Sequence, residues 1–199
     1  MVSLSATAKV GLKAAGKLDK PLRCHAFWLP EIPGPQLHLN DESFSAYESV
    51  IAKHQPLRYV LFGGQNGTDL RNLTGISVSC LDNFHGIEFH YDNNSIPLER
   101  RKLGPFLDYD YPKVVHFPIN GPEGELVTGV EVDEFFYPEG DTPWWYDEGP
   151  SNWQLVTRPI TIDPETTITG LYAATDKRNG LIGLGAISEV INEQVASCP

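Results

Sequence analysis

Apolar and polar residues alternate along several short segments of the chain, which is the pattern of half-buried β-strands. Ile87 and Phe89, for example, occupy alternate positions and are expected to point inward. The predicted strands lie at 58–62, 75–79, 86–91, 114–119, 126–132, 154–162, 167–173 and 181–189. Turn residues separate them. Strands at this spacing predict an all-β fold, which is an antiparallel sandwich, barrel or prism.

The first 56 residues follow a different pattern. We expect 1–56 to be an N-terminal extension packed on the β domain, which spans 57–199. Residues 1–20 contain lysines and small residues without a continuous apolar stretch. They predict a flexible arm, with a weak amphipathic helix as the alternative.

Prolines punctuate the next part of the extension. They predict a loop over 21–40 that contains one short strand at 25–29. A helix is predicted over 41–54, because apolar residues recur there at helical spacing and a proline follows. Asn40 or Asp41 can cap this helix.

A short sequence recurs three times at predicted strand starts. Threonine and glycine precede an aliphatic residue at Thr74-Gly75-Ile76, Thr128-Gly129-Val130 and Thr169-Gly170-Leu171. Three similar strand starts in one β domain indicate three similar sheets. The alternative is that Thr-Gly before an aliphatic residue is a common strand start, and the sequence leaves both interpretations open.

Several segments, taken in order, resemble the jacalin-like lectin family. The matching parts are the glycine-rich stretch 62–67, the strand pair 75–79 and 86–91, the middle segment 121–130, and a closing hairpin formed by 168–174 and 180–187. The resemblance covers about 57–190. It implies a β-prism, in which three antiparallel four-stranded sheets form a triangular arrangement. Prism lectins often assemble, so the resemblance also allows a homo-oligomer.

The resemblance implies a sugar site between two loops. The first is the opening glycine loop, here Gly63, Gly64 and Gln65. The second has the pattern Gly-x-x-x-Asp near the C-terminus, where Gly180 matches the glycine.

The aspartate of that second loop is missing, because Leu184 stands at its position. A carboxylate accepts charge-assisted hydrogen bonds from sugar hydroxyls, and leucine accepts none. We therefore expect the usual sugar site to be absent or rebuilt. Asp176, in the loop that reaches Asn179, offers a substitute carboxylate; the alternative is a solvated turn.

One long segment is rich in aromatic, acidic, proline and glycine residues and predicts a loop. Trp144, Trp145 and Tyr146 offer flat faces for a sugar ring or an apolar metabolite. Asp147 and Glu148 are candidate proton carriers. The alternative is a loop that packs its own tryptophans over the open end of the domain.

Histidine adds one more candidate proton carrier, His116, in a predicted strand. His85 and His90 are five residues apart, so on one strand they face opposite sides, which argues against shared metal binding. The sequence has no zinc spacing, phosphate-binding loop, dinucleotide fingerprint or Gly-x-Ser-x-Gly elbow. We expect no metal and no organic cofactor.

The charge of the chain narrows the classes of partner. The 199 residues carry a formal net charge of −11, which repels phosphate backbones and anionic lipid. We therefore expect no nucleic acid or membrane partner. Small neutral, cationic or carbohydrate ligands remain.

The cellular compartment stays open. The N-terminus does not resemble a signal peptide, which favours the cytoplasm. Three glycosylation sequons, at Asn66, Asn72 and Asn93, leave secretion open. The three cysteines Cys24, Cys80 and Cys198 allow one disulfide in an exported protein.

Two functions remain as hypotheses. The first is a jacalin-like binding protein for a carbohydrate or other small ligand, with a non-standard site. The second is a cofactor-free enzyme of secondary metabolism, a cyclase or isomerase of the pericyclase type, which uses an aromatic pocket and one acid or base. A shallow, polar, solvent-facing site favours binding, and a deep aromatic cavity favours catalysis.

Overall fold

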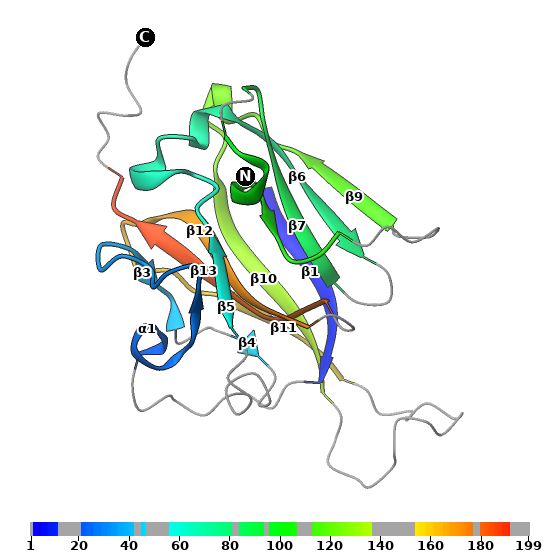
Figure 1. The fold of residues 1–199 in the computed structure, drawn as a ribbon. Coiled ribbons are helices and arrows are strands. Elements are labelled where there is room, and N and C mark those ends of the chain that lie inside the picture. Colours follow the sequence, from blue (N-terminus) through cyan, green and yellow to red (C-terminus); the bar gives the residue numbers. More distant parts are fainter. Residues whose placement is uncertain are drawn as a thin grey trace, which may run out of the picture.

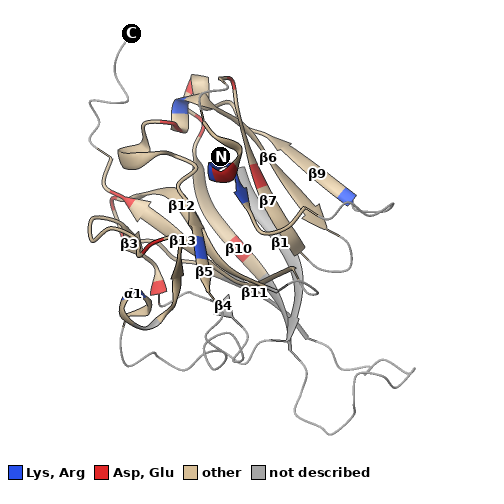
Figure 2. Cartoon of the chain, in the orientation of Figure 1, with Lys and Arg blue, Asp and Glu red and all other residues tan. Residues whose placement is uncertain are grey.

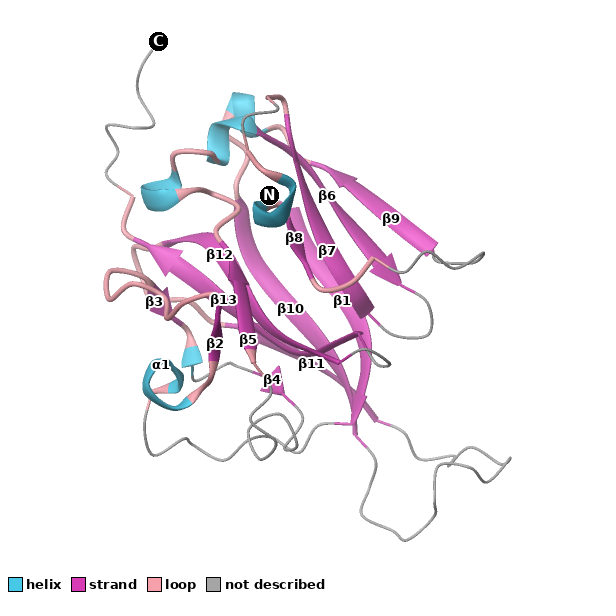
Figure 3. Cartoon of the chain, viewed as in Figure 1, coloured by secondary structure: helices cyan, strands magenta, loops and turns pink. Residues whose placement is uncertain are grey.

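The protein is all-β, as the alternating pattern predicts (Figure 1). The computed structural model describes residues 2–11, 21–41, 45–46, 56–80, 84–93, 96–106, 113–136, 154–176 and 180–191. Strands dominate these residues, and helices are short (Figure 3). No helix in this described part is long and apolar enough to cross a membrane.

The described strands are β1 (Val2–Gly11), β2 (Trp28–Leu29), β3 (His38–Leu39), β4 (Ser45–Ala46), β5 (Leu57–Val60), β6 (Leu73–Cys80), β7 (Phe84–Tyr91), β8 (Lys102–Leu103), β9 (Lys113–Pro118), β10 (Val127–Phe136), β11 (Gln154–Ile160), β12 (Thr167–Asp176) and β13 (Gly180–Glu189). The described helices are α1 (Leu22–His25) and the 3₁₀ helices Gln65–Gly67, Leu70–Asn72, Leu98–Arg100 and Gly121–Glu123.

The strands form three sheets. The largest has the order β2-β5-β12-β13-β3, and β4 also pairs with β13. A four-stranded sheet has the order β8-β7-β6-β9, and a three-stranded sheet has the order β1-β10-β11. Among the described strands from residue 57 onward, every pairing with one another is antiparallel, as predicted. Two pairings are parallel, β1 with β10 and β2 with β5, and each involves a strand of the N-terminal extension. The triangular prism stays a prediction.

The three Thr-Gly motifs fall in three different sheets, on β6, β10 and β12. In each motif the strand register shifts at the threonine, between Leu73 and Gly75, between Ile168 and Gly170, and at Thr128 opposite β1. A register shift of this kind is a β-bulge, which leaves one residue unpaired and bends the strand. The repeat therefore marks the same backbone irregularity once in each sheet.

The aliphatic residues that flank these bulges are buried in the main hydrophobic core. They are Leu73 and Ile76 on β6, Val127 and Val130 on β10, and Ile168 and Leu171 on β12. Phe62 and Phe89 stack at the centre of the same core, with ring centroids 4.6 Å apart. One continuous core thus joins all three sheets.

The N-terminal residues correct two predictions. Residues 2–11, expected as a flexible arm, form strand β1 alongside β10. Strand formation agrees with the alternation of apolar and small polar residues in this segment, which a sheet edge can pair. Ser45–Ala46, inside the predicted helix, form strand β4 instead and pair with β13. The rest of the predicted helix after Asp41 lies outside the described residues.

The helix of the extension lies earlier in the chain, at α1, in the stretch expected to be loop. The carboxylate of Asp41 accepts a 2.9 Å hydrogen bond from the backbone N–H of Leu22 in the first turn of α1. Burial raises the pKa of this carboxyl, against the opposing effects of that hydrogen bond and of Arg23. Asp41 therefore supports α1, rather than the helix it was expected to cap.

A second hydrophobic core forms where residues 21–41 cover the six-stranded sheet. Its buried members are Leu22, Trp28, Leu37, Leu57, Tyr172, Ala174, Ile182 and Ile187. The sheet thus has the main core on one face and this second core on the other.

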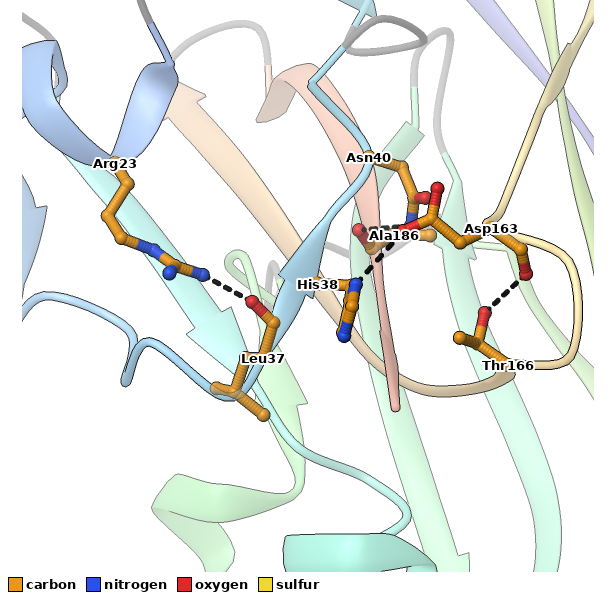
Figure 4. A network of polar contacts seen from close by, with 7 residues as sticks. All are labelled: Arg23, Leu37, His38, Asn40, Asp163, Thr166 and Ala186. Atoms are coloured by element: carbon orange, nitrogen blue, oxygen red, sulfur yellow. Dashed lines mark hydrogen bonds and ion pairs between the residues drawn. The ribbon is translucent and has the colours of Figure 1, made fainter. Parts of the chain in front are cut away.

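Polar contacts hold the edge of the extension in place (Figure 4). Arg23 donates to the carbonyl of Leu37, and Asn40 donates to the carbonyl of Ala186 through both its backbone and its side chain. His38 Nδ1 lies 3.0 Å from a carboxylate oxygen of Asp163, on the β11–β12 connection. The contacts of Asn40 and His38 therefore attach the extension to the β domain, and the Arg23 bond lies within the extension.

Candidate functional site

A row of polar side chains crosses the four-stranded sheet on its outer face, the face opposite the main core. Ser77 is paired with Glu88 on one side and His116 on the other, and Glu88 is paired with Lys102. Directly paired residues share one face of a sheet, while Ile76 and Val78 face the core. One residue from each of the four strands therefore contributes to this row.

Ser77 lies at the centre of a cluster with two histidines. Its hydroxyl oxygen is 2.7 Å from His90 Nε2 and 3.1 Å from His116 Nδ1. The two imidazole rings meet edge to face, with centroids 5.2 Å apart. Ser77 is buried, His90 is half-buried and His116 is exposed. We call these three residues the histidine cluster.

A glycine makes this arrangement possible. Gly75, two residues before Ser77 on β6, has no side chain, and the ring of His116 occupies the space above it. A Cβ atom at Gly75 would lie 2.6 Å from His116 Cε1, which is too close for any real contact. Gly75 therefore allows His90 and His116, which lie on strands either side of β6, to approach each other.

The electrostatics of the cluster favour neutral imidazole at His90. Burial is the main cause that lowers the pKa of His90, and His116, Arg101 and Lys102 lower it further, while Glu88 opposes them. Glu88 itself forms a 3.2 Å ion pair with Lys102. Figure 2 shows both signs of charge on this sheet, around β7 and β9.

The cluster has the chemistry of a polar binding site or a proton-transfer site. A hydroxyl can donate one hydrogen bond and accept others, and a neutral imidazole offers one donor and one acceptor. Among the residues that the structure describes, no group of three or more histidine, cysteine, aspartate or glutamate side chains could hold a metal ion. Cys24 and Cys80 are both free thiols.

The predicted glycine loop has a well-defined structure. The N–H of Gly63 donates to the carbonyl of Thr169, and the N–H of Asn66 donates to the carboxylate of Glu189 at 3.1 Å. The Thr169 hydroxyl donates to the other oxygen of Glu189 at 2.6 Å. Glu189 is almost completely buried, so a satisfied internal carboxylate fixes this loop.

The structure does not bring the two predicted sugar-binding loops together. Gly63 contacts Thr169 at the start of β12 and Asn66 contacts Glu189 at the end of β13, whereas Asp176 and Gly180 pair with each other at the opposite ends of these strands. The ten-residue strand β13 separates the two positions by about 30 Å.

Gly180 and Leu184 both have packing roles in this structure. A Cβ atom at Gly180 would lie 2.7 Å from Nδ1 of the buried His85. The glycine therefore leaves the space that this histidine needs. Leu184 pairs with Ala173 and is buried in the main core. An aspartate at 184 would therefore face the core, not a ligand.

Other predicted site residues lie outside the described residues: Trp144, Trp145, Tyr146, Asp147, Glu148 and Asn179. His116 is described and belongs to the histidine cluster. Sequence reasoning missed Ser77 and His90 as members of a site. The available signal was their outward position, alternating with residues of the main core, but no sequence pattern showed that both approach His116.

Comparisons with protein-family models, with curated proteins and with solved structures found no match to this chain. The fold and the candidate site therefore define the class of this chain only as an all-β protein with a polar histidine cluster on an exposed sheet face.

Proposed function

We propose that the protein binds a carbohydrate or another small polar ligand, and that the ligand sits on the outer face of the four-stranded sheet, over the histidine cluster. The observation that carries the proposal is the convergence of Ser77, His90 and His116 from three strands on one exposed face. The resemblance to jacalin-like lectins supports the carbohydrate class.

The exposure of His116, Val114 and Pro118 on this face supports binding more than catalysis. A ligand on an open sheet face remains in contact with water, and imidazole and hydroxyl groups exchange hydrogen bonds with the hydroxyls of a sugar. Exposed Val114 and Pro118 flank His116 on β9 and offer apolar surface beside the polar groups. Polar groups beside a small apolar surface are what a sugar ring requires.

A glycan-array screen tests the proposal with three proteins: wild type, His116→Gln and His38→Gln. The His38 variant is the matched control, because it makes the same substitution at an exposed histidine away from the cluster. Binding by wild type and by the control, with loss in His116→Gln, is the expected result. Equal binding by all three would place the sugar elsewhere, and Trp145→Ala would then test the aromatic segment.

The same cluster favours one second function, proton transfer in a cofactor-free isomerase. Two imidazoles joined by one hydroxyl can act as an acid and a base on one substrate. A bell-shaped pH dependence of turnover, with one limb lost in His90→Gln, would support this function. Binding without turnover of the bound compound would exclude it.

A further inference from the structure

The charge around the histidine cluster differs from the charge of the whole chain. The chain has a formal net charge of −11. The charged groups that act on His90 are His116 on β9, Arg101 and Lys102 at β8, and Glu88 on β7. Glu88 is the one acidic group among them.

That one carboxylate is already paired. Lys102 Nζ lies 3.2 Å from Glu88 Oε2, so the two charges largely cancel. Lys102 Nζ also lies 4.8 Å from the centroid of the Phe106 ring, which further restricts its position. The ammonium and the carboxylate together contribute little net charge to the cluster.

Arg101 carries the other positive charge that acts on His90, but its side chain lies against Tyr91 of the main core, on the other face of the sheet. Its Nε donates to the carbonyl of Ile96, and its guanidinium lies 5.6 Å from the centroid of the Tyr91 ring. A carbonyl and an aromatic ring hold the guanidinium without neutralising it. Among the groups that act on His90, the cluster therefore faces no unpaired carboxylate, and an imidazole can take up a proton to become positively charged.

We infer that the histidine cluster binds the anionic group of its ligand, a carboxylate or a sulfate on a sugar or similar small molecule. This inference rests on the proposed function, because it assigns the ligand class of the same site. The imidazole N–H groups are the donors, since Ser77 shares its single proton with the two rings, and hydrogen bonds from such donors to an anion are stronger than those to a neutral hydroxyl.

Anion binding at this site is coupled to proton uptake. At neutral pH His90 is mostly uncharged, since its pKa lies below the ordinary value. An anion beside His90 favours the protonated imidazole, so affinity must rise as the pH falls toward the lowered pKa of His90. A neutral sugar has no such dependence.

NMR titration of the histidine ring signals tests the inference with three probes at constant ionic strength: D-glucuronate, inorganic sulfate and D-glucose. The expected result is saturable shifts of His90 and His116 with both anions, at least about tenfold tighter than with glucose. The affinity for both anions should be higher at pH 6.0 than at pH 7.5. His116→Gln should abolish these shifts, and His38→Gln, an exposed histidine elsewhere, should retain them.

The outcomes separate this inference from the proposed function. Glucose that shifts the two histidines as strongly as glucuronate would overturn the anion preference and leave polar-ligand binding at this site intact. Absence of any shift with all three probes, while an array detects a glycan that still binds His116→Gln, would overturn both. If the anion affinity is the same at both pH values, protonation of the imidazoles does not contribute to binding, and the coupling to proton uptake is wrong.

Discussion

The Ser77 hydroxyl has a single proton to share between two imidazoles. If it donates to His90 Nε2 at 2.7 Å, it can only accept from His116 Nδ1 at 3.1 Å. The proton positions on the two histidines are therefore linked through Ser77. A ligand that selects one tautomer of His116 will also select the tautomer of His90.

The lowered pKa of His90 predicts a dependence of stability on pH. A histidine whose pKa is lower in the folded than in the unfolded protein takes up its proton more readily when unfolded. Its effect is absent above pH 6.5 and destabilises the fold as the pH falls below that value. NMR titration of His90 should therefore give a midpoint below 6.5, and His90→Gln should unfold with a shallower pH dependence between 7 and 5. A midpoint above 6.5 would contradict the prediction.

The buried carboxylate of Glu189 predicts a large effect of a single substitution. Glu189→Ala removes the acceptor of both the Asn66 N–H and the Thr169 hydroxyl, and should cost about 2–4 kcal/mol of unfolding free energy. Urea denaturation measures the loss. Glu123→Ala, at an exposed position, is the matched control and should stay within about 0.5 kcal/mol of wild type. Equal stability of the two variants would show that the carboxylate does not fix the glycine loop.

At the scale of elements, alternation predicted the strands that have one face in the main core. All eight predicted strands from residue 57 onward are present, with bounds that differ by at most four residues. Alternation in 2–11 was not recognised, because its polar positions are serine, threonine and lysine and several apolar ones are alanine. The two-residue strands β3, β4 and β8 are too short for any periodicity and depend on tertiary pairing.

The pairing of β1 with β10 predicts that the first eleven residues stabilise the fold. Their deletion leaves the edge of β10 unpaired at seven register positions, and should cost roughly 3 kcal/mol or more at about 0.5 kcal/mol each. The melting temperature of the truncated chain measures the effect. The control is Ser5→Pro in the full-length chain, since proline removes a donor within β1 and should produce part of the same loss. If the truncated chain has the melting temperature of wild type, residues 1–11 do not stabilise the fold and the prediction is wrong.

At the scale of the whole molecule, the sequence predicted the individual strands better than it predicted how they are placed relative to one another. The residues expected at the sugar site lie at opposite ends of the β12–β13 hairpin, because Gly63 contacts the start of β12 and Gly180 pairs with Asp176 at its end. Conversely, His90 and His116 are 26 positions apart and meet only because Gly75 and Ser77 lie between them on β6. Local patterns carry no information on such distances.

Net charge is similarly misleading at this scale. A value of −11 argues against anionic partners for the surface as a whole. Salt screens charges beyond about 10 Å at 0.1 M ionic strength, so the nearest groups decide what a small ligand experiences. Around His90 these groups are mostly basic.

The second core predicts how the extension and the β domain unfold. Trp28 is buried against Tyr59 and Tyr172, with ring centroids at 6.3 and 5.6 Å. Because these partners belong to β5 and β12, the extension completes the six-stranded sheet and should not unfold separately. Trp28→Ala should therefore destabilise the entire protein by about 3–5 kcal/mol in a single transition.

Urea denaturation followed by circular dichroism and by tryptophan fluorescence measures this effect, and the two curves should coincide. Phe27→Ala removes the neighbouring aromatic ring, which is 56% exposed, and should change the midpoint little. Two separated transitions in Trp28→Ala, with the later one at the wild-type midpoint, would mean that the β domain is stable without its extension. The second core would then be a contact between independent units, and the polar contacts of Figure 4 would serve only to attach one to the other.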